Sequence, residues 1–111
     1  MGVYSVSMEA QQATNEAQTD KITAEALRHA GKCILKLVKA GEPMGPQQTY
    51  RRGFNAADEF VCDSPATGRA FEQATDKVGD VTVMALKHNI SGEQAAEFYY
   101  NQAQTIDPTD E

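Results

Sequence analysis

The sequence predicts an all-α protein, a small bundle of four helices with an antiparallel helical hairpin at its centre. Apolar residues recur at helical spacing in four separate segments, and residues that favour turns or helix ends stand between those segments. The chain has 111 residues, which is the size of one domain. A fifth helix is added if the first residues of the chain form one.

Residues 1–19 are polar, with many Gln, Thr and Ala residues. Ala10, Ala13 and Ala17 would share one side of a helix, but an alanine stripe buries little apolar area. We therefore expect either a helix that frays, separate from the next one or continuous with it, or a disordered polar arm. The bundle itself is expected to span residues 20–104.

The strongest signal is an amphipathic helix that begins at Thr19 or Asp20 and ends at Lys39. Gly41 is suited to the left-handed position just after a helix, and Pro43 prevents the helix from continuing. The apolar stripe of this helix consists of Ile22, Ala26, Leu27, Ala30, Cys33, Ile34, Leu37 and Val38. The opposite face carries half of the ten basic residues of the chain, namely Lys21, Arg28, Lys32, Lys36 and Lys39.

A second helix is expected over residues 47–62, antiparallel to the first because the loop between them is short. Its apolar stripe consists of Tyr50, Phe54, Ala57 and Val61. Gly53 lies within this helix at a cost of about 1 kcal/mol relative to Ala. That cost indicates a neighbouring helix that passes close to residue 53.

A third helix is expected to begin with Ser64 as its N-cap and Pro65 at its first position. It is expected to end at Asn89, which is suited to a left-handed C-terminal position. The β-branched residues within residues 80–86 would also allow a strand. We favour a helix because the helical period runs through them unbroken and no second strand exists to pair with. The stripe of this helix consists of Phe71, Ala74, Val78, Val81 and Ala85.

The last helix is expected to begin at Ser91, which forms a capping-box pattern with Gln94, and to run to about Ala103. It carries three consecutive aromatic residues, Phe98, Tyr99 and Tyr100. The acidic residues 105–111 are expected to form a disordered tail.

The composition excludes several classes of function. Sixteen acidic and ten basic residues give a net charge of −6, which argues against binding to nucleic acid or to anionic membranes. No apolar run reaches the ~18 residues that span a membrane, and Met1–Val6 has no signal-peptide pattern. We therefore expect a cytoplasmic protein. The apolar residues are mostly small and Trp is absent, so a monomer would be marginally stable and a homodimer is expected.

Cys33 and Cys62 are the only cysteines. In the expected hairpin they are offset by about seven residues, or ~10 Å along the helix axis, which exceeds the ~7 Å Cα limit for a disulfide. Two buried thiols are therefore favoured over a disulfide or a reactive thiol. His29 and Cys33 have the spacing of metal ligands, but a zinc site needs two more. We expect no metal and no cofactor and, because no catalytic motif is present, no enzymatic activity.

Two groups of residues are candidates for binding. The first is basic, with one tyrosine as a stacking surface: Arg28, Lys32, Lys36, Lys39, Tyr50, Arg51 and Arg52. Three interpretations of this group are open. It is either a solvated face whose bases pair with the protein's own acids, or a site for an acidic protein, or a site for a phosphate-bearing ligand. The second is apolar and belongs either to the core or to an interface: Val83, Leu86, Phe98, Tyr99 and Tyr100.

The expected function is that of a non-catalytic protein–protein interaction module, such as a small acidic adaptor, inhibitor, immunity-type or chaperone-like protein. The alternative is a protein that binds a nucleotide or another phosphate-bearing ligand through the basic helix face. A thiol- or metal-dependent protein that uses Cys33 and Cys62 is a third interpretation.

Overall fold

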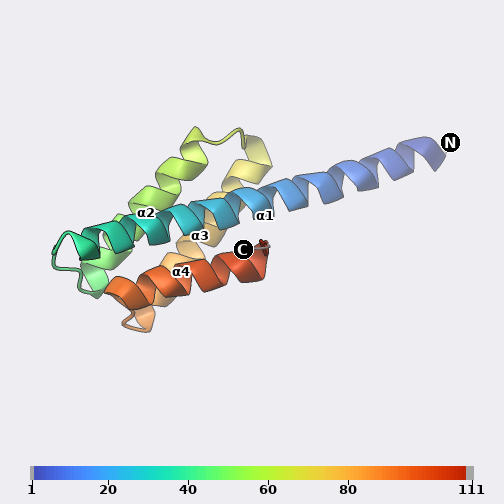
Figure 1. The fold of residues 1–111 in the computed structure, drawn as a ribbon. Helices are drawn as coiled ribbons and strands as arrows, with labels where there is room; N and C mark the ends of the chain where they lie inside the picture. The colour runs from blue at the N-terminus through green and yellow to red at the C-terminus, as the bar shows by residue number, and fades with distance from the viewer. Residues whose placement is uncertain (1, 110–111) are drawn as a thin grey trace.

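The computed structural model describes the backbone of residues 2–109 and the side chains of residues 16–109. Four helices follow one another along the chain: α1 (Gly2–Lys39), α2 (Pro46–Asp63), α3 (Gly68–Lys87) and α4 (Gly92–Ile106) (Figure 1). The predicted all-α bundle is confirmed, and residues 80–86 lie within α3. None of these helices combines the length and the apolar character needed to cross a membrane.

Helix α1 is continuous over 38 residues, so residues 2–19 extend the predicted first helix and do not form a separate one. Its N-terminal part projects beyond the other three helices (Figure 1). A helix of this length measures about 57 Å, and the whole structure measures 61 Å along its longest axis. The side chains of Ala10 and Ala13 lie outside the described residues, and Ala17 is exposed.

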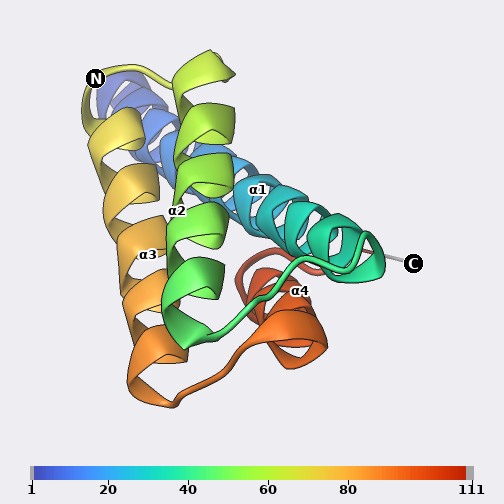
Figure 2. The ribbon, with the colours of Figure 1, turned by 90° about the vertical axis from the view of Figure 1, so that its left-hand side faces the viewer.

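The helices form two layers with the core between them. α1 and α4 lie side by side and antiparallel in one layer, and α2 and α3 form an antiparallel pair in the other (Figures 1 and 2). α2 turns back against α1, as the short loop predicts, and crosses it obliquely (Figure 2). The most extensive packing of α1 is against α4, an association that the periodicity of the sequence does not predict.

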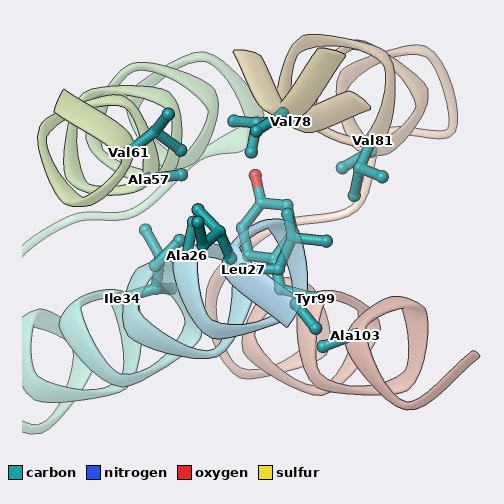
Figure 3. Packing of buried hydrophobic residues seen from close by; sticks show 14 of the residues in the cluster. Ala26, Leu27, Ile34, Ala57, Val61, Val78, Val81, Tyr99 and Ala103 are labelled. Atoms are coloured by element: carbon teal, nitrogen blue, oxygen red, sulfur yellow. The ribbon is translucent and has the colours of Figure 1, made fainter. Parts of the chain in front are cut away.

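The core consists mainly of alanine side chains with a few larger ones between the two layers (Figure 3). Tyr99 of α4 is the largest fully buried side chain, and its hydroxyl group points towards Val78 (Figure 3). The ring packs against Gly53 of α2, where a β-carbon would lie 2.8 Å from the Tyr99 hydroxyl oxygen. The expected close helix is therefore replaced by a side chain: the Tyr99 ring, reaching across from α4, occupies the space beside Gly53.

Among the described side chains, four threonines are buried although the predicted stripes are apolar: Thr19, Thr23, Thr49 and Thr82. The hydroxyl of Thr23 donates to the Thr19 carbonyl at 2.7 Å, one turn earlier in α1. A hydroxyl satisfied by its own helix in this way can be buried without an unpaired polar group. α1 therefore buries threonines beside its apolar stripe, whereas Cys33, Leu37 and Val38 of the predicted stripe are only half-buried.

Two of the predicted helix ends are confirmed by their backbone geometry. Gly41 has a φ of +83° and Asn89 a φ of +60°, the left-handed conformation that ends α1 and α3. The Gly41 N–H donates to the Val38 carbonyl at 3.0 Å, and the Asn89 N–H donates to the Leu86 carbonyl at 3.1 Å. Ile90, which follows Asn89, packs against the core.

The predicted start of the third helix at Ser64 and Pro65 is wrong. The Ser64 hydroxyl donates to the carbonyl of Val61 at 2.6 Å, so Ser64 closes the last turn of α2 instead of starting α3. Helix α3 begins three residues after Pro65, at Gly68. Ser91 is the N-cap of α4, as predicted, but its side chain makes no capping hydrogen bond.

The end of the chain differs from the expected disordered tail. Helix α4 continues to Ile106, beyond the predicted end at Ala103. Thr109 then folds back on Gln104, because its N–H and its hydroxyl donate to Gln104 Oε1 at 3.2 and 3.1 Å. Residues 105 and 106 thus belong to α4 and not to the tail, and residues 110 and 111 lie outside the described part of the chain.

Candidate functional site

A groove of about 880 Å³ lies between α1 and α4. Each helix lines it with residues at the i, i+3, i+4, i+7 spacing that places side chains on one helix face. They are Arg28, Gly31, Lys32 and Leu35 from α1 and Glu93, Ala96, Glu97 and Tyr100 from α4, with Thr109 beyond α4. Ile34 and Tyr99 point from the same helices into the core (Figure 3). The groove therefore opens away from the core, on the outer side of the α1–α4 layer.

The two helices approach closely at the floor of the groove. A β-carbon at Gly31 would lie 3.1 Å from the carbonyl oxygen of Ala96, so a larger residue at position 31 would push the helices apart. Leu35 and Tyr100 flank this contact and make the floor apolar. Tyr100 is 42% exposed, more than the other exposed large hydrophobic residues of the described chain.

The side chain of Arg28 closes one end of the groove. Its Nη2 donates to Oε1 of Gln104 and, at 2.7 Å, to the backbone carbonyl of Asp107. This carbonyl lies just after α4, where the partial negative charge of a helix C-terminus favours a cation. Arg28 therefore has a structural role, since it joins α1 to the end of α4.

Charges of opposite sign stand on the two walls of the open part of the groove. Lys32 belongs to the α1 wall, Glu93 and Glu97 belong to the α4 wall, and all three are exposed. Within residues 16–109, no ion pair joins these three side chains to one another or to any other residue. All three charges can therefore pair with groups on another molecule.

The predicted basic group is divided by the fold. Arg28 and Lys32 line the groove, whereas Arg52 pairs with Glu42 at 3.7 Å and Tyr50 is half-buried in α2. The remaining members are exposed but do not line the groove: Lys36, Lys39 and Arg51. The structure thus assigns two members of the group to the groove, and one of these two is engaged by the end of α4.

The groove residues of α4, apart from Tyr100, are absent from the predicted site. Glu93 and Glu97 are four positions apart, as are Ala96 and Tyr100, so the four residues form a second helical stripe beside the core stripe. That stripe is the signal that could identify them. The packing of α4 on α1 decides that it faces the groove, and the sequence does not show this packing.

The predicted apolar group occupies three environments. Tyr100 lines the groove, Val83 is 37% exposed on α3, and both Leu86 and Phe98 are half-buried. Tyr99 is 0% exposed, so it belongs to the core and not to an interface. Of this group, Tyr100 and Val83 remain as surface residues.

The hydroxyl group of Tyr99 is buried and has no hydrogen-bond partner among the described residues. Its burial raises the pKa of Tyr99 to about 12, and the nearby Tyr50 adds to the rise. Burial therefore favours the neutral form of Tyr99 in the folded protein, which links its ionisation to folding.

Both cysteines are free; Cys33 is half-buried and Cys62 is exposed, so the expectation of two buried thiols is wrong. Cys62 follows Val61, which takes the core-facing position of α2 and leaves the next residue facing solvent. Cys33 Sγ lies 3.7 Å from Nε2 of His29. Among the described residues, no three His, Cys, Asp or Glu side chains are grouped closely enough to hold a metal ion.

The groove is built from two helices that are far apart in the sequence, so no short motif represents it. Comparison of the chain with protein-family models, with curated proteins and with solved structures finds no match.

Proposed function

We propose that the protein is a non-catalytic protein–protein interaction module that holds its partner in the α1–α4 groove. The observation that carries the proposal is the composition of the groove, in which Leu35 and Tyr100 lie between charged side chains. An apolar centre with a polar rim is typical of protein interfaces, and apolar grooves commonly take an amphipathic helix. A half-exposed tyrosine suits such a surface because its ring is apolar and its hydroxyl tolerates water.

The charges of the groove narrow the kind of partner that we propose. A wholly acidic partner, expected from the basic face of α1 alone, would meet Glu93 and Glu97 as well as Lys32. A helix with an apolar face flanked by both acidic and basic residues fits better, because each wall then meets the opposite charge. The same two carboxylates disfavour a nucleotide or another phosphate-bearing ligand in this groove.

The proposal includes no catalysis. The thiol–imidazole pair of Cys33 and His29 lies inside α1, more than a turn from its C-terminal end. Backbone N–H groups inside a helix donate to carbonyls one turn earlier, so none near this pair can stabilise a developing oxyanion. We therefore assign the pair no chemical step.

We further propose that the protein acts in the cytoplasm and self-associates. Cys33 and Cys62 are free thiols, which are typical of proteins in reducing compartments. The core is rich in alanine, and small side chains contribute little apolar area, so burial of the groove against a second protein would add stability.

A pair of matched variants tests the groove. Tyr100 and Val83 are similarly exposed, at 42% and 37%, but Tyr100 lines the groove and Val83 lies on α3. Each residue is changed to Ser, and the wild-type and variant proteins are immobilised to capture proteins from the source cells for identification by mass spectrometry. We expect Tyr100→Ser to lose a partner that the wild type and Val83→Ser both retain.

Equal capture by the two variants would contradict the proposal that the groove binds the partner. Loss of the partner from Val83→Ser alone would show that the binding surface lies on α3. Circular dichroism of both variants is expected to match that of the wild type, because exposed substitutions seldom change stability by more than about 0.5 kcal/mol. This measurement separates loss of binding from loss of folding.

A further inference from the structure

We infer that the partner held in the groove is a second copy of this chain, docked about a two-fold axis that runs parallel to α1 and α4. The inference rests on the proposed function, since it names the occupant of the same groove. It is carried by the positions of Lys32, Glu93 and Glu97 along the two helices.

The three charged residues stand at nearly the same height along the groove. α1 and α4 are antiparallel (Figure 1), and Gly31 is level with Ala96 because a β-carbon at residue 31 would lie 3.1 Å from the Ala96 carbonyl oxygen. Because the helices are antiparallel, the next residue along α1 is level with the preceding residue of α4, and each residue adds about 1.5 Å of height. Lys32 therefore stands midway in height between Glu93 and Glu97.

A two-fold axis can bring the grooves of two copies face to face, with their helices lying along the same direction, in two ways. An axis parallel to the helices preserves heights and places α1 of one copy over α4 of the other. Lys32 of each copy then faces Glu93 and Glu97 of the other copy, twice by symmetry. An axis across the helices places α1 over α1 and α4 over α4, so that the basic α1 wall faces its own copy and the carboxylates of α4 face carboxylates. Like charges in contact oppose association, which selects the first axis.

The selected arrangement makes a four-helix core from the two α1–α4 pairs, with each α1 antiparallel to the α4 that it faces. Stripes at the i, i+3, i+4, i+7 spacing are those that line the interior of such bundles. Leu35, Ala96 and Tyr100 supply the apolar contacts, and the charge pairs flank them. The α2–α3 layers, with the exposed Val83, stay on the outside of the dimer.

Sedimentation equilibrium of charge variants tests the inference. Lys32→Glu makes the open part of the groove acidic throughout, and Glu93→Lys/Glu97→Lys makes it basic throughout. We expect each variant alone to dimerise at least about tenfold more weakly than the wild type, since every reversed contact occurs twice. An equimolar mixture of the two variants is expected to dimerise as strongly as the wild type.

Arg51→Glu makes the same charge change as Lys32→Glu at an exposed position of α2 and is expected to leave dimerisation unchanged.

A spin label on α1 tests the direction of the axis. The label is attached at Glu16→Cys, an exposed position, in a Cys33→Ser/Cys62→Ser background. An axis parallel to the helices keeps the two labels at the same end of the dimer, so a short distance between them is expected. An axis across the helices at the height of Lys32 would separate them by about 48 Å along the helices, and a distance near this value would overturn the proposed arrangement.

A wild-type chain that stays monomeric at every concentration tested would overturn the inference, as would charge variants that dimerise as strongly as the wild type. A different result would contradict the proposed function, namely capture of partner proteins that does not depend on Tyr100. A monomer that still captures another protein through Tyr100 would retain the groove as a binding site and would remove the second copy as its occupant.

Discussion

The ring of Tyr99 lies directly against the backbone of Gly53, so closely that a β-carbon at residue 53 would stand 2.9 Å from Tyr99 Cε2 and 3.1 Å from Cζ. α2 thus carries no side chain where the tyrosine of α4 meets it. Because Tyr99 faces inward here, the next residue, about a quarter turn further round α4, faces the groove. That residue is Tyr100. Gly53 therefore leaves the space in which α4 packs on α1 with Tyr99 inward and Tyr100 in the groove.

Gly53→Ala should destabilise the fold. Alanine gains about 1 kcal/mol in helix propensity, but its β-carbon would meet the Tyr99 ring, and overpacking costs about 1–3 kcal/mol or more. We expect a net loss of about 1 kcal/mol in the free energy of unfolding, measured by urea denaturation. Gly79→Ala in α3 is the matched control, because its β-carbon would meet its nearest neighbour only at 4.0 Å, and it should stabilise the protein. Equal stability of the two variants would contradict the packing of Tyr99 on Gly53.

Tyr99 should make the fold sensitive to alkali. Burial raises the pKa of Tyr99 from 10.0 to about 12, with a further contribution from Tyr50. A raised tyrosine pKa contributes stability that is complete below the pKa of the unfolded chain and is lost as the pH rises through the folded pKa, because the unfolded chain ionises first. The free energy of unfolding should therefore fall between pH 10 and about 12, as measured by urea titrations across this range.

Tyr99→Phe is the control for this pH dependence. It removes a buried hydroxyl that has no partner among the described residues, so its stability at neutral pH should match the wild type to within about 1 kcal/mol. The alkaline loss should be smaller than in the wild type. An alkaline loss of the same size in both proteins would assign the effect to other groups.

Arg28→Ala should loosen the end of α4. The change removes the hydrogen bonds to Gln104 and to the Asp107 carbonyl, and hydrogen bonds to charged groups contribute about 1.5–3 kcal/mol. We expect a loss of about 2 kcal/mol and faster hydrogen exchange at the amides of Asp107 and Thr109. Lys32→Ala, at an exposed position one turn away, should change neither quantity. Unchanged exchange in Arg28→Ala would show that the arginine does not hold this segment.

Phosphate-bearing ligands should not stabilise the protein through the groove. Glu93 and Glu97 stand on the wall opposite Lys32, so an anion that approaches the lysine also approaches two carboxylates. A ligand at 100 times its Kd would add about 2.7 kcal/mol, whereas we expect no change in melting temperature with ATP or with inorganic phosphate. An increase that disappears in Lys32→Ala would contradict this expectation and would support the phosphate-ligand alternative.

Local patterns in the sequence predict the existence of the helices well, because helix faces and many helix ends depend on neighbouring residues. Gly41 and Asn89 end α1 and α3 as predicted, since a left-handed residue can end a helix whatever the tertiary contacts are. Other ends are missed: α1 begins at Gly2 and α4 ends at Ile106. Ser64 shows one cause, because a serine between two helices can either close the first or cap the second, and its hydroxyl closes α2.

The groove could be predicted only in part, because periodicity specifies the faces of a helix but not the neighbour that each face meets. Tyr99 enters the core with Ala95 and Ala103, which share its helix face, and Gly53 leaves the space for its ring. Lys32 and Tyr100 are found by their charge and aromatic character. Glu93 and Glu97 become site residues only through the packing of α4 on α1.

Concentration-dependent NMR spectra of the wild-type protein test most directly whether the α1–α4 groove binds a second copy of the chain. As the protein is concentrated, we expect the amide signals of Lys32, Leu35 and Glu97 in the groove to shift together along one binding curve. The signals of Val83 and Met84, exposed on α3, should stay in place. Shifts confined to α3, or groove signals that do not move at any concentration, would contradict the account.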